Sequence, residues 1–153
     1  MQKKVLSEIS LYNGTVKMPK DWEIDREKLT KDILAQHLFQ EDFKFSKNWD
    51  MLNTYIKDHI NLRYNLRLVN KKTWGNIYKP NNSSSPLKEI DEVDLKNSPD
   101  FVLLYGVKIQ KDSCFVKVFY DDNRRKGRSW DIPLNDNTFI MFPSTLMYYL
   151  SPN

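Results

Sequence analysis

Apolar positions in the N-terminal half of the chain recur every three or four residues, the spacing of one face of an α-helix. The first such stretch begins at Asp25, a suitable N-cap, and runs to about Phe39, with the apolar positions Leu29, Ile33, Leu34 and Leu38. A second helix is expected after Ser46, with one face formed by Trp49, Leu52, Ile56 and Ile60. The pattern therefore predicts two amphipathic helices between residues 24 and 62.

The C-terminal half changes to an alternation of apolar and polar residues, which is typical of half-buried strands. Strands are expected at residues 62–68, 73–78, 101–109, 114–120, 130–134, 138–142 and 146–150. Residues 101–109 are nearly all apolar, which predicts a strand covered on both faces. Near the N-terminus, Asn13–Gly14 has the composition of a two-residue turn, so residues 1–20 are expected to form a hairpin.

Two helices followed by many short strands predict one α+β domain with a sandwich or barrel core. A chain of 153 residues is a usual size for one domain, here divided into the hairpin of residues 1–20, the helices of 24–62 and the strands of 62–153. At 40% hydrophobic residues the chain can build such a core. No apolar run approaches the roughly 20 residues that a membrane-spanning helix needs, so no membrane partner is expected.

Cysteine and histidine are too scarce to support the commonest metal and disulfide chemistry. The only cysteine, Cys114, excludes an internal disulfide and lies in an apolar stretch, which predicts a small buried hydrophobe rather than a nucleophile. The two histidines, His37 and His59, lie in the predicted helices without a carboxylate at a recognisable motif spacing. One cysteine and two histidines exclude a zinc site built from these ligands alone.

The formal net charge of +4 is mild, and the strongest charge cluster is a predicted turn that contains Arg124, Arg125, Lys126 and Arg128. Trp130 follows it, and arginines beside an aromatic ring can bind the backbone and bases of nucleic acid. Acidic residues flank the run and partly cancel its charge, namely Asp121, Asp122 and Asp131. A solvated turn is the favoured interpretation, and a contact to an anion or to nucleic acid is the alternative.

Near its end the chain reads Phe-Pro-Ser-Thr-Leu-Met-Tyr over residues 142–148 and closes with Pro152–Asn153. This segment resembles the closing strands of the Fe(II)- and 2-oxoglutarate-dependent oxygenases of tailed phages, T4-like and marine, in which the pattern is roughly Phe-Pro-Ser-x-Leu-x-His. The resemblance extends back through residues 118–121 and 101–105 to the Trp-x-Asn-x-Tyr pattern of 74–78, about half of the chain. It implies a double-stranded β-helix, or jelly roll, of antiparallel strands with two N-terminal helices packed on it.

Oxygenases of this family hold Fe(II) on two histidines and a carboxylate, which leave three positions open for 2-oxoglutarate and oxygen. The resemblance places the first ligand positions at Ser83 and Ser85 and the distal histidine at Tyr148. Serine hydroxyls are poor Fe(II) ligands, and tyrosine favours Fe(III). The basic residue that binds the 2-oxoglutarate carboxylate is expected after Asn153. These positions are therefore interpreted as vestiges of a metal site, with no metal, no cofactor and no catalytic residue.

The expected function is that of a non-catalytic, oxygenase-like jelly-roll protein of a tailed phage, acting as a binding or structural module. An unidentified protein, for example a virion component, is its expected partner, and the host cytoplasm during infection or the virion is its expected location. Two alternatives remain open: an active Fe(II)/2-oxoglutarate oxygenase with atypical ligands, and a nucleic-acid-binding protein that uses the Arg124–Arg128 turn. The carboxylates nearest the predicted site suit Mg²⁺ or Ca²⁺ better than iron and are expected to be solvated; they are Asp91, Glu92, Asp94, Asp121 and Asp122.

Overall fold

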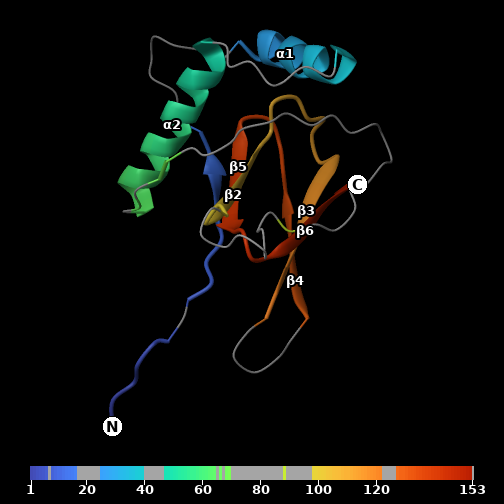
Figure 1. Cartoon of the computed structure of the whole chain (residues 1–153). Coiled ribbons are helices and arrows are strands. Elements are labelled where there is room, and N and C mark those ends of the chain that lie inside the picture. Colours follow the sequence, from blue (N-terminus) through green and yellow to red (C-terminus); the bar gives the residue numbers. More distant parts are fainter. Residues whose placement is uncertain are drawn as a thin grey trace.

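The computed structural model describes residues 1–6, 8–16, 25–39, 47–64, 66, 68, 69, 88, 98–121 and 127–152 (Figure 1). These residues form an α+β structure of two helices and two three-stranded antiparallel sheets. The helices are α1 (Arg26–Phe39) and α2 (Lys47–Tyr64). Sheet A has the strand order β1 (Tyr12–Thr15), β5 (Thr138–Pro143), β2 (Phe101–Tyr105). Sheet B has the order β4 (Arg128–Pro133), β3 (Cys114–Tyr120), β6 (Met147–Pro152).

The first helix begins where its sequence predicts. The backbone N–H of Lys28 donates a hydrogen bond of 3.0 Å to Asp25 Oδ1, so Asp25 is the N-cap of α1. Leu29 and Ile33 are buried as expected, but Leu34 is 43% exposed because it lies about 100° around the helix from Ile33. In α2 the expected apolar face is confirmed for Leu52, Ile56 and Ile60, which are all buried. Ser46 and the side chains of Leu38 and Trp49 lie outside the described residues.

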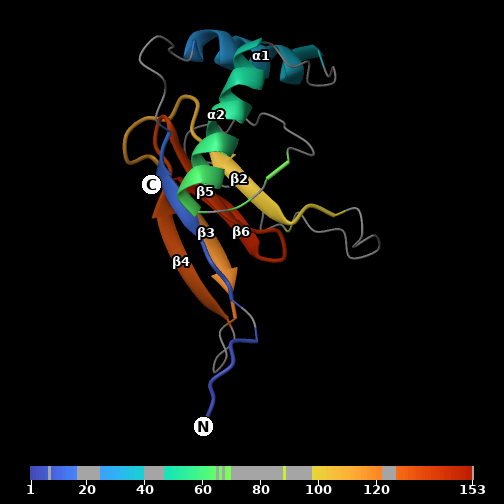
Figure 2. The same cartoon turned by 90° about the vertical axis from the view of Figure 1, so that its left-hand side faces the viewer.

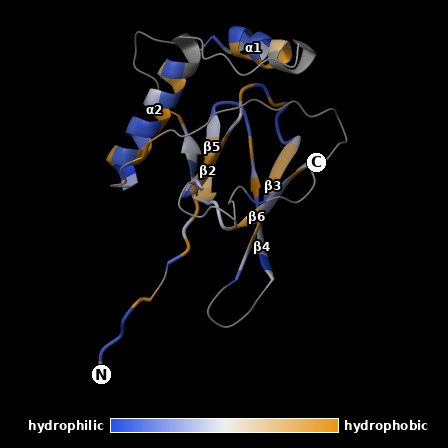
Figure 3. Cartoon of the chain, viewed as in Figure 1, coloured by the Kyte–Doolittle hydropathy of each residue, from blue (hydrophilic) through white to orange (hydrophobic). Residues whose placement is uncertain are grey.

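Sheet A lies between α2 and sheet B, so both of its faces are covered, and α1 lies beyond the end of the sheets, next to one end of α2 (Figure 1, Figure 2). In β5, Phe139 and Met141 pack with the buried residues of α1 and α2, whereas Ile140 and Phe142 pack with sheet B. In β2, Val102 and Leu104 likewise belong to the core between the two sheets. This two-sided burial explains the nearly continuous apolar sequence of both strands and confirms that β2 is covered on both faces. The strand expected at residues 101–109 is too long, however, because β2 ends at Tyr105 and residues 106–109 belong to no strand. The helices carry both polar and apolar residues, as one-sided packing requires (Figure 3).

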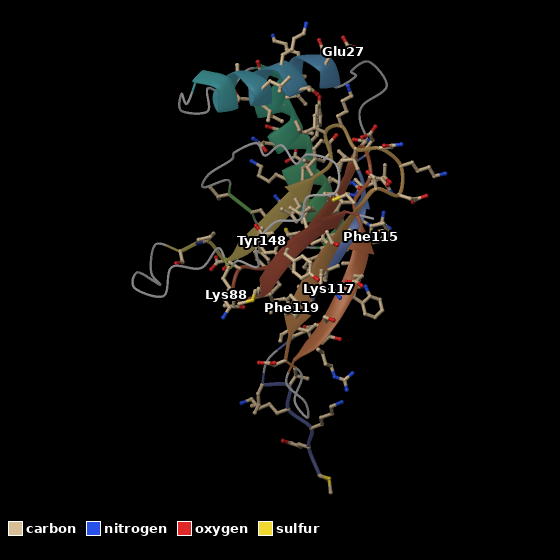
Figure 4. The ribbon with its side chains drawn as sticks, turned by 90° about the vertical axis from the view of Figure 1, so that its right-hand side faces the viewer. Glu27, Lys88, Phe115, Lys117, Phe119 and Tyr148 are labelled. Atoms are coloured by element: carbon tan, nitrogen blue, oxygen red, sulfur yellow. The ribbon has the colours of Figure 1, made fainter. Side chains whose placement is uncertain are left out.

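Sheet B covers sheet A with one face and turns the other outward. Val116, Val118 and Ile132 are buried against sheet A. The alternate residues of β3 lie on the outer face, where Phe115, Lys117 and Phe119 are only half-buried (Figure 4). The alternation predicted for residues 114–120 is therefore confirmed. The strands expected at 130–134, 138–142 and 146–150 are also confirmed, as β4, β5 and β6 with slightly shifted ends.

Two local predictions near the helices are wrong. Asn13–Gly14 lies inside β1 and pairs with Ile140 and Phe139 of β5, so it forms no two-residue turn. A two-stranded hairpin is marginal alone, and pairing with the buried strand β5 supplies the missing partner. The strand expected at residues 62–68 is also wrong, because residues 66 and 68 belong to no strand and α2 continues to Tyr64. Its ring packs on that of Tyr12 with centroids 4.7 Å apart, which stabilises the last helical turn on sheet A.

A candidate ligand cleft beside Tyr148

Tyr148 is the only expected metal-site position within the described residues, and its side chain is part of the core. It lies on β6, opposite Val118 of β3, and is 4% exposed. Its ring packs edge-to-face on Phe142, with centroids 5.1 Å apart and an interplanar angle of 63°. The position that the resemblance gives to a histidine is thus occupied by an aromatic ring between the two sheets (Figure 4).

The other residues of the terminal motif also have packing roles. Phe142 and Leu146 are buried in the core between the sheets. Ser144 is 2% exposed, its hydroxyl donates a hydrogen bond to the carbonyl of Pro99, and its N–H donates one of 3.0 Å to the carbonyl of Asp100. These bonds attach the turn between β5 and β6 to the start of β2. The packing of the fold therefore explains the motif without a ligand.

The structure does not place the other expected ligand positions. Ser83 and Ser85 lie outside the described residues, as do Asp91, Glu92, Asp94 and Asp122. Among the residues that are described, no group of three or more His, Cys, Asp or Glu side chains could hold a metal ion. His59 contributes an edge-on aromatic contact to Phe139 at 5.9 Å, and the side chain of His37 is outside the described part.

An open cleft of about 390 Å³ lies next to Tyr148, at the end of the sandwich where β3 finishes and β6 starts. It is lined by Ile9, Ser10, Leu11, Val118, Tyr120, Trp130 and Leu146. Val118 is the cross-strand partner of Tyr148, and Leu146 precedes Tyr148 by two residues. The cleft therefore borders the part of the β3–β6 pair that holds Tyr148.

Two aromatic rings give this cleft its chemical character, and one cation lies on the same face of the β3–β4 hairpin. Tyr120 and Trp130 line it, and Trp130 is 61% exposed. Arg128 is exposed, is the cross-strand partner of Tyr120, and precedes Trp130 by two residues. Because side chains alternate along a strand and partners share a face, all three lie on the same face of the hairpin. The Cβ atoms of a directly opposed pair are about 5 Å apart, which brings Arg128 beside the ring of Tyr120.

Two of the acidic residues that flank the basic run, Asp121 and Asp131, have partners of their own. Asp131 lies on the opposite face of β4 and forms a salt bridge of 3.3 Å with Lys117. Asp121 Oδ1 accepts a hydrogen bond of 2.9 Å from the N–H of Gly127, so this carboxylate closes the turn. Arg124, Arg125 and Lys126 lie outside the described residues, so Arg128 is the one expected basic contact that the structure places.

Sequence reasoning identified Arg128 and Trp130 but missed the cleft between them and the N-terminal segment. Ile9, Ser10 and Leu11 were expected in a local hairpin, and instead they meet Tyr120 and Trp130 from the distant β3–β4 hairpin. One feature of the sequence could have indicated the cleft. Tyr120 and Trp130 lie on either side of the turn between β3 and β4, where strand residues are no longer covered by the neighbouring sheet.

Cys114 and the helices add no further chemistry. The Cys114 side chain is half-buried against the core between the sheets, and burial raises the pKa of its thiol from 9.0. This fits the expected role as a small hydrophobe, because the thiolate is the nucleophilic form. Within the described residues, neither helix is both long and apolar enough to cross a membrane. Comparison of the chain with protein-family models, with curated proteins and with solved structures found no match.

Proposed function

We propose that this protein is a non-catalytic binding module built on a jelly-roll scaffold of the phage oxygenase type. The observation that carries the proposal is Tyr148, whose buried ring packs on Phe142 where a functional oxygenase needs a metal-binding histidine. The expected phage origin, and with it a location in the host cytoplasm or on the virion, rests on the resemblance alone. Mass spectrometry of purified virions distinguishes the two locations.

The order of the strands supports the jelly-roll part of the proposal. Along the chain, β2 lies in sheet A, β3 and β4 in sheet B, β5 in sheet A and β6 in sheet B. The last of these strands returns to lie beside β3, as the fourth strand of a Greek key lies beside the first. Repeated crossing between two antiparallel sheets is characteristic of jelly rolls. The terminal motif contributes the turn from β5 to β6, where the resemblance is strongest.

The surroundings of Tyr148 also support a function without iron chemistry. An Fe(II) centre of this class needs three coordination positions open to 2-oxoglutarate and oxygen. The Tyr148 ring instead lies among apolar side chains, with Val118 opposite it on β3 and Phe142 in edge-to-face contact. The adjacent cleft keeps a recess at the end of the sandwich, and its apolar and aromatic walls suit the binding of a ligand rather than a hydrated metal ion.

Anaerobic titration calorimetry with Fe(II) and 2-oxoglutarate tests this proposal. We expect no saturable heat for either compound at micromolar concentrations, and no iron in elemental analysis of the purified protein. Iron-dependent conversion of 2-oxoglutarate to succinate, or micromolar binding of both compounds, would establish the alternative of an oxygenase with atypical ligands. An active oxygenase of the same family serves as the positive control for the anaerobic handling.

A further inference from the structure

We propose that the Asn13–Gly14 pair is a deamidation site that sheet A protects and that becomes reactive when β1 leaves the sheet. The proposal goes beyond the proposed function and does not depend on it. Asn13 is exposed and lies inside β1, at one side of the strand order of sheet A. The residue after it is glycine, which hinders attack on the asparagine side chain least because it has no Cβ.

The reaction needs only water and the backbone of the next residue. The backbone nitrogen of Gly14 attacks the side-chain carbonyl carbon of Asn13, loses its proton and expels the side-chain nitrogen as ammonia, so that a cyclic succinimide forms. Water then adds to one of the two carbonyl groups of the succinimide. Opening on one side gives aspartate. Opening on the other side gives isoaspartate, in which the backbone runs through the former side chain and is longer by a methylene group.

Pairing with β5 blocks the first step. The backbone N–H of Val16 donates a hydrogen bond of 3.0 Å to the carbonyl of Asn137, and hydrogen-bonded pairs alternate along antiparallel strands. The N–H of Gly14, which lies opposite Phe139, is therefore directed to the Phe139 carbonyl. Attack on the Asn13 side chain requires this peptide plane to rotate out of the extended geometry that the pairing fixes.

The packing of the fold favours the reactive glycine at this position. A Cβ added to Gly14 would lie 3.3 Å from Cε1 of Phe139. The Phe139 ring is buried among residues of the two helices and cannot give way freely. A larger residue, which would slow the deamidation, is thus disfavoured by the same contact that packs β1 on the core.

Isoaspartate at this position would keep β1 out of the sheet. The strand is short and is anchored at both ends, because Tyr12 packs on Tyr64 with ring centroids 4.7 Å apart and Val16 is buried with the helices. A longer backbone between these anchors shifts one against the other, so both cannot keep their register with β5. Ile9 and Leu11 precede β1 and line the cleft, so detachment of β1 also removes a wall of the cleft. Deamidation thus converts a transient opening of β1 into a lasting one.

Peptide mapping by mass spectrometry measures the rate at which Asn13 is converted in protein incubated at mildly alkaline pH. The native wild type is compared with the wild type in urea and with two variants, Val16→Ala and Val118→Ala. Both valines are buried and lose the same atoms, but Val16 directly follows β1 whereas Val118 lies in sheet B. Circular dichroism and urea denaturation verify that each variant is folded.

We expect Asn13 to react at least about tenfold more slowly in the native wild type than in urea. Val16→Ala should accelerate the native reaction about tenfold, the factor that corresponds to the loss of two buried carbon atoms, and Val118→Ala should accelerate it less. Equal rates for the native and the unfolded wild type overturn the proposal. Equal acceleration by the two variants also overturns it, because global unfolding rather than opening of β1 then exposes the site.

Hydrogen exchange of the Gly14 amide gives a test that needs no variant. Urea concentrations below the unfolding transition should raise its exchange rate and the deamidation rate of Asn13 by the same factor, because both reactions require the same opening. A change in one rate without the other refutes the coupling.

The lasting step is tested on the isoaspartate form, separated after incubation. The matched control is Asn13→Asp, which carries the same new charge on a backbone of ordinary length. The isoaspartate form should lose the hydrogen-exchange protection of β1, whereas Asn13→Asp should keep it, and equal protection in both refutes the lasting detachment. These measurements use neither iron nor 2-oxoglutarate, so their failure is distinguishable from a failure of the proposed function in calorimetry.

Discussion

Replacement of Asn137, in the turn before β5, by alanine should destabilise sheet A. Asn137 has a left-handed backbone conformation with φ of 58°. Its Oδ1 accepts a hydrogen bond of 2.7 Å from the hydroxyl of Tyr105, and its Nδ2 donates one of 3.0 Å to the carbonyl of Val16. Its backbone groups bond to Val16 and Gly106. One residue therefore joins the ends of β1 and β2 to the start of β5.

The magnitude follows from three losses. Each of the two side-chain hydrogen bonds contributes about 1 kcal/mol, because both bonds are at least partly buried. Alanine in the left-handed region costs about 1 kcal/mol more, since asparagine tolerates this region better than residues without a short polar side chain. The free energy of unfolding of Asn137→Ala should fall by about 3 kcal/mol. For a chain of this size that change lowers the melting temperature by about 6–12 °C.

Urea denaturation followed by circular dichroism measures the effect, provided that the slope against urea concentration is unchanged. Two control variants separate the contributions. Asn137→Gly loses both side-chain bonds but adopts positive φ freely, so it should lose only about 2 kcal/mol. Asn137→Asp keeps the acceptor for Tyr105 and should lose about 1 kcal/mol. An Asn137→Ala variant within about 0.5 kcal/mol of the wild type, or a glycine variant less stable than the alanine variant, would refute the reasoning.

Four further predictions concern the core and the thiol. Gly106→Ala should abolish soluble expression or cost more than about 2 kcal/mol, because an added Cβ would lie 2.1 Å from the carbonyl oxygen of Asn135; urea denaturation or the soluble yield measures this. Cys114 should react slowly with a thiol reagent at neutral pH and rapidly in urea, because burial raises the pKa of the thiol above 9.0 and suppresses the thiolate; equal rates would contradict its burial. The same raised pKa stabilises the fold below pH 9.0. This contribution to the free energy of unfolding should be lost as the pH rises through the pKa of the thiol in the folded protein, an effect absent from Cys114→Ser. Tyr148→His should lower stability by about 2 kcal/mol without creating Fe(II) binding in calorimetry, and iron binding by this single variant would show that core packing does not exclude the metal.

The strands of the C-terminal half were predictable because their apolar periods and bounding turn residues agree. The whole of β3 follows the alternation of Val116 and Val118 with polar or half-buried neighbours. The α1 boundary was predictable from Asp25, whose capping bond depends only on residues within one helical turn. Local sequence sufficed wherever the signal, an apolar period or a capping residue, lies within the segment itself.

Predictions failed where a distant segment decides the structure. Asn13–Gly14 has the local preference for a turn, but β5 offers a complete row of backbone partners, and this pairing overrides the preference. Tyr64 is in helix because its ring packs on Tyr12, a contact between residues that are far apart in sequence. The cleft was missed for the same reason, since its walls come from the N-terminal segment and from the β3–β4 hairpin.

The burial of Tyr148 and the opening of the cleft are consequences of the same packing. A buried aromatic ring of this kind stabilises the fold by about 2–3 kcal/mol, a contribution that a histidine at a metal site could make only with its metal bound. Val118 of β3 packs opposite Tyr148 of β6, so apolar side chains stabilise the pairing of these two strands. Val118 also lines the cleft, so the same packing that buries Tyr148 supports the wall next to Tyr120 and Trp130.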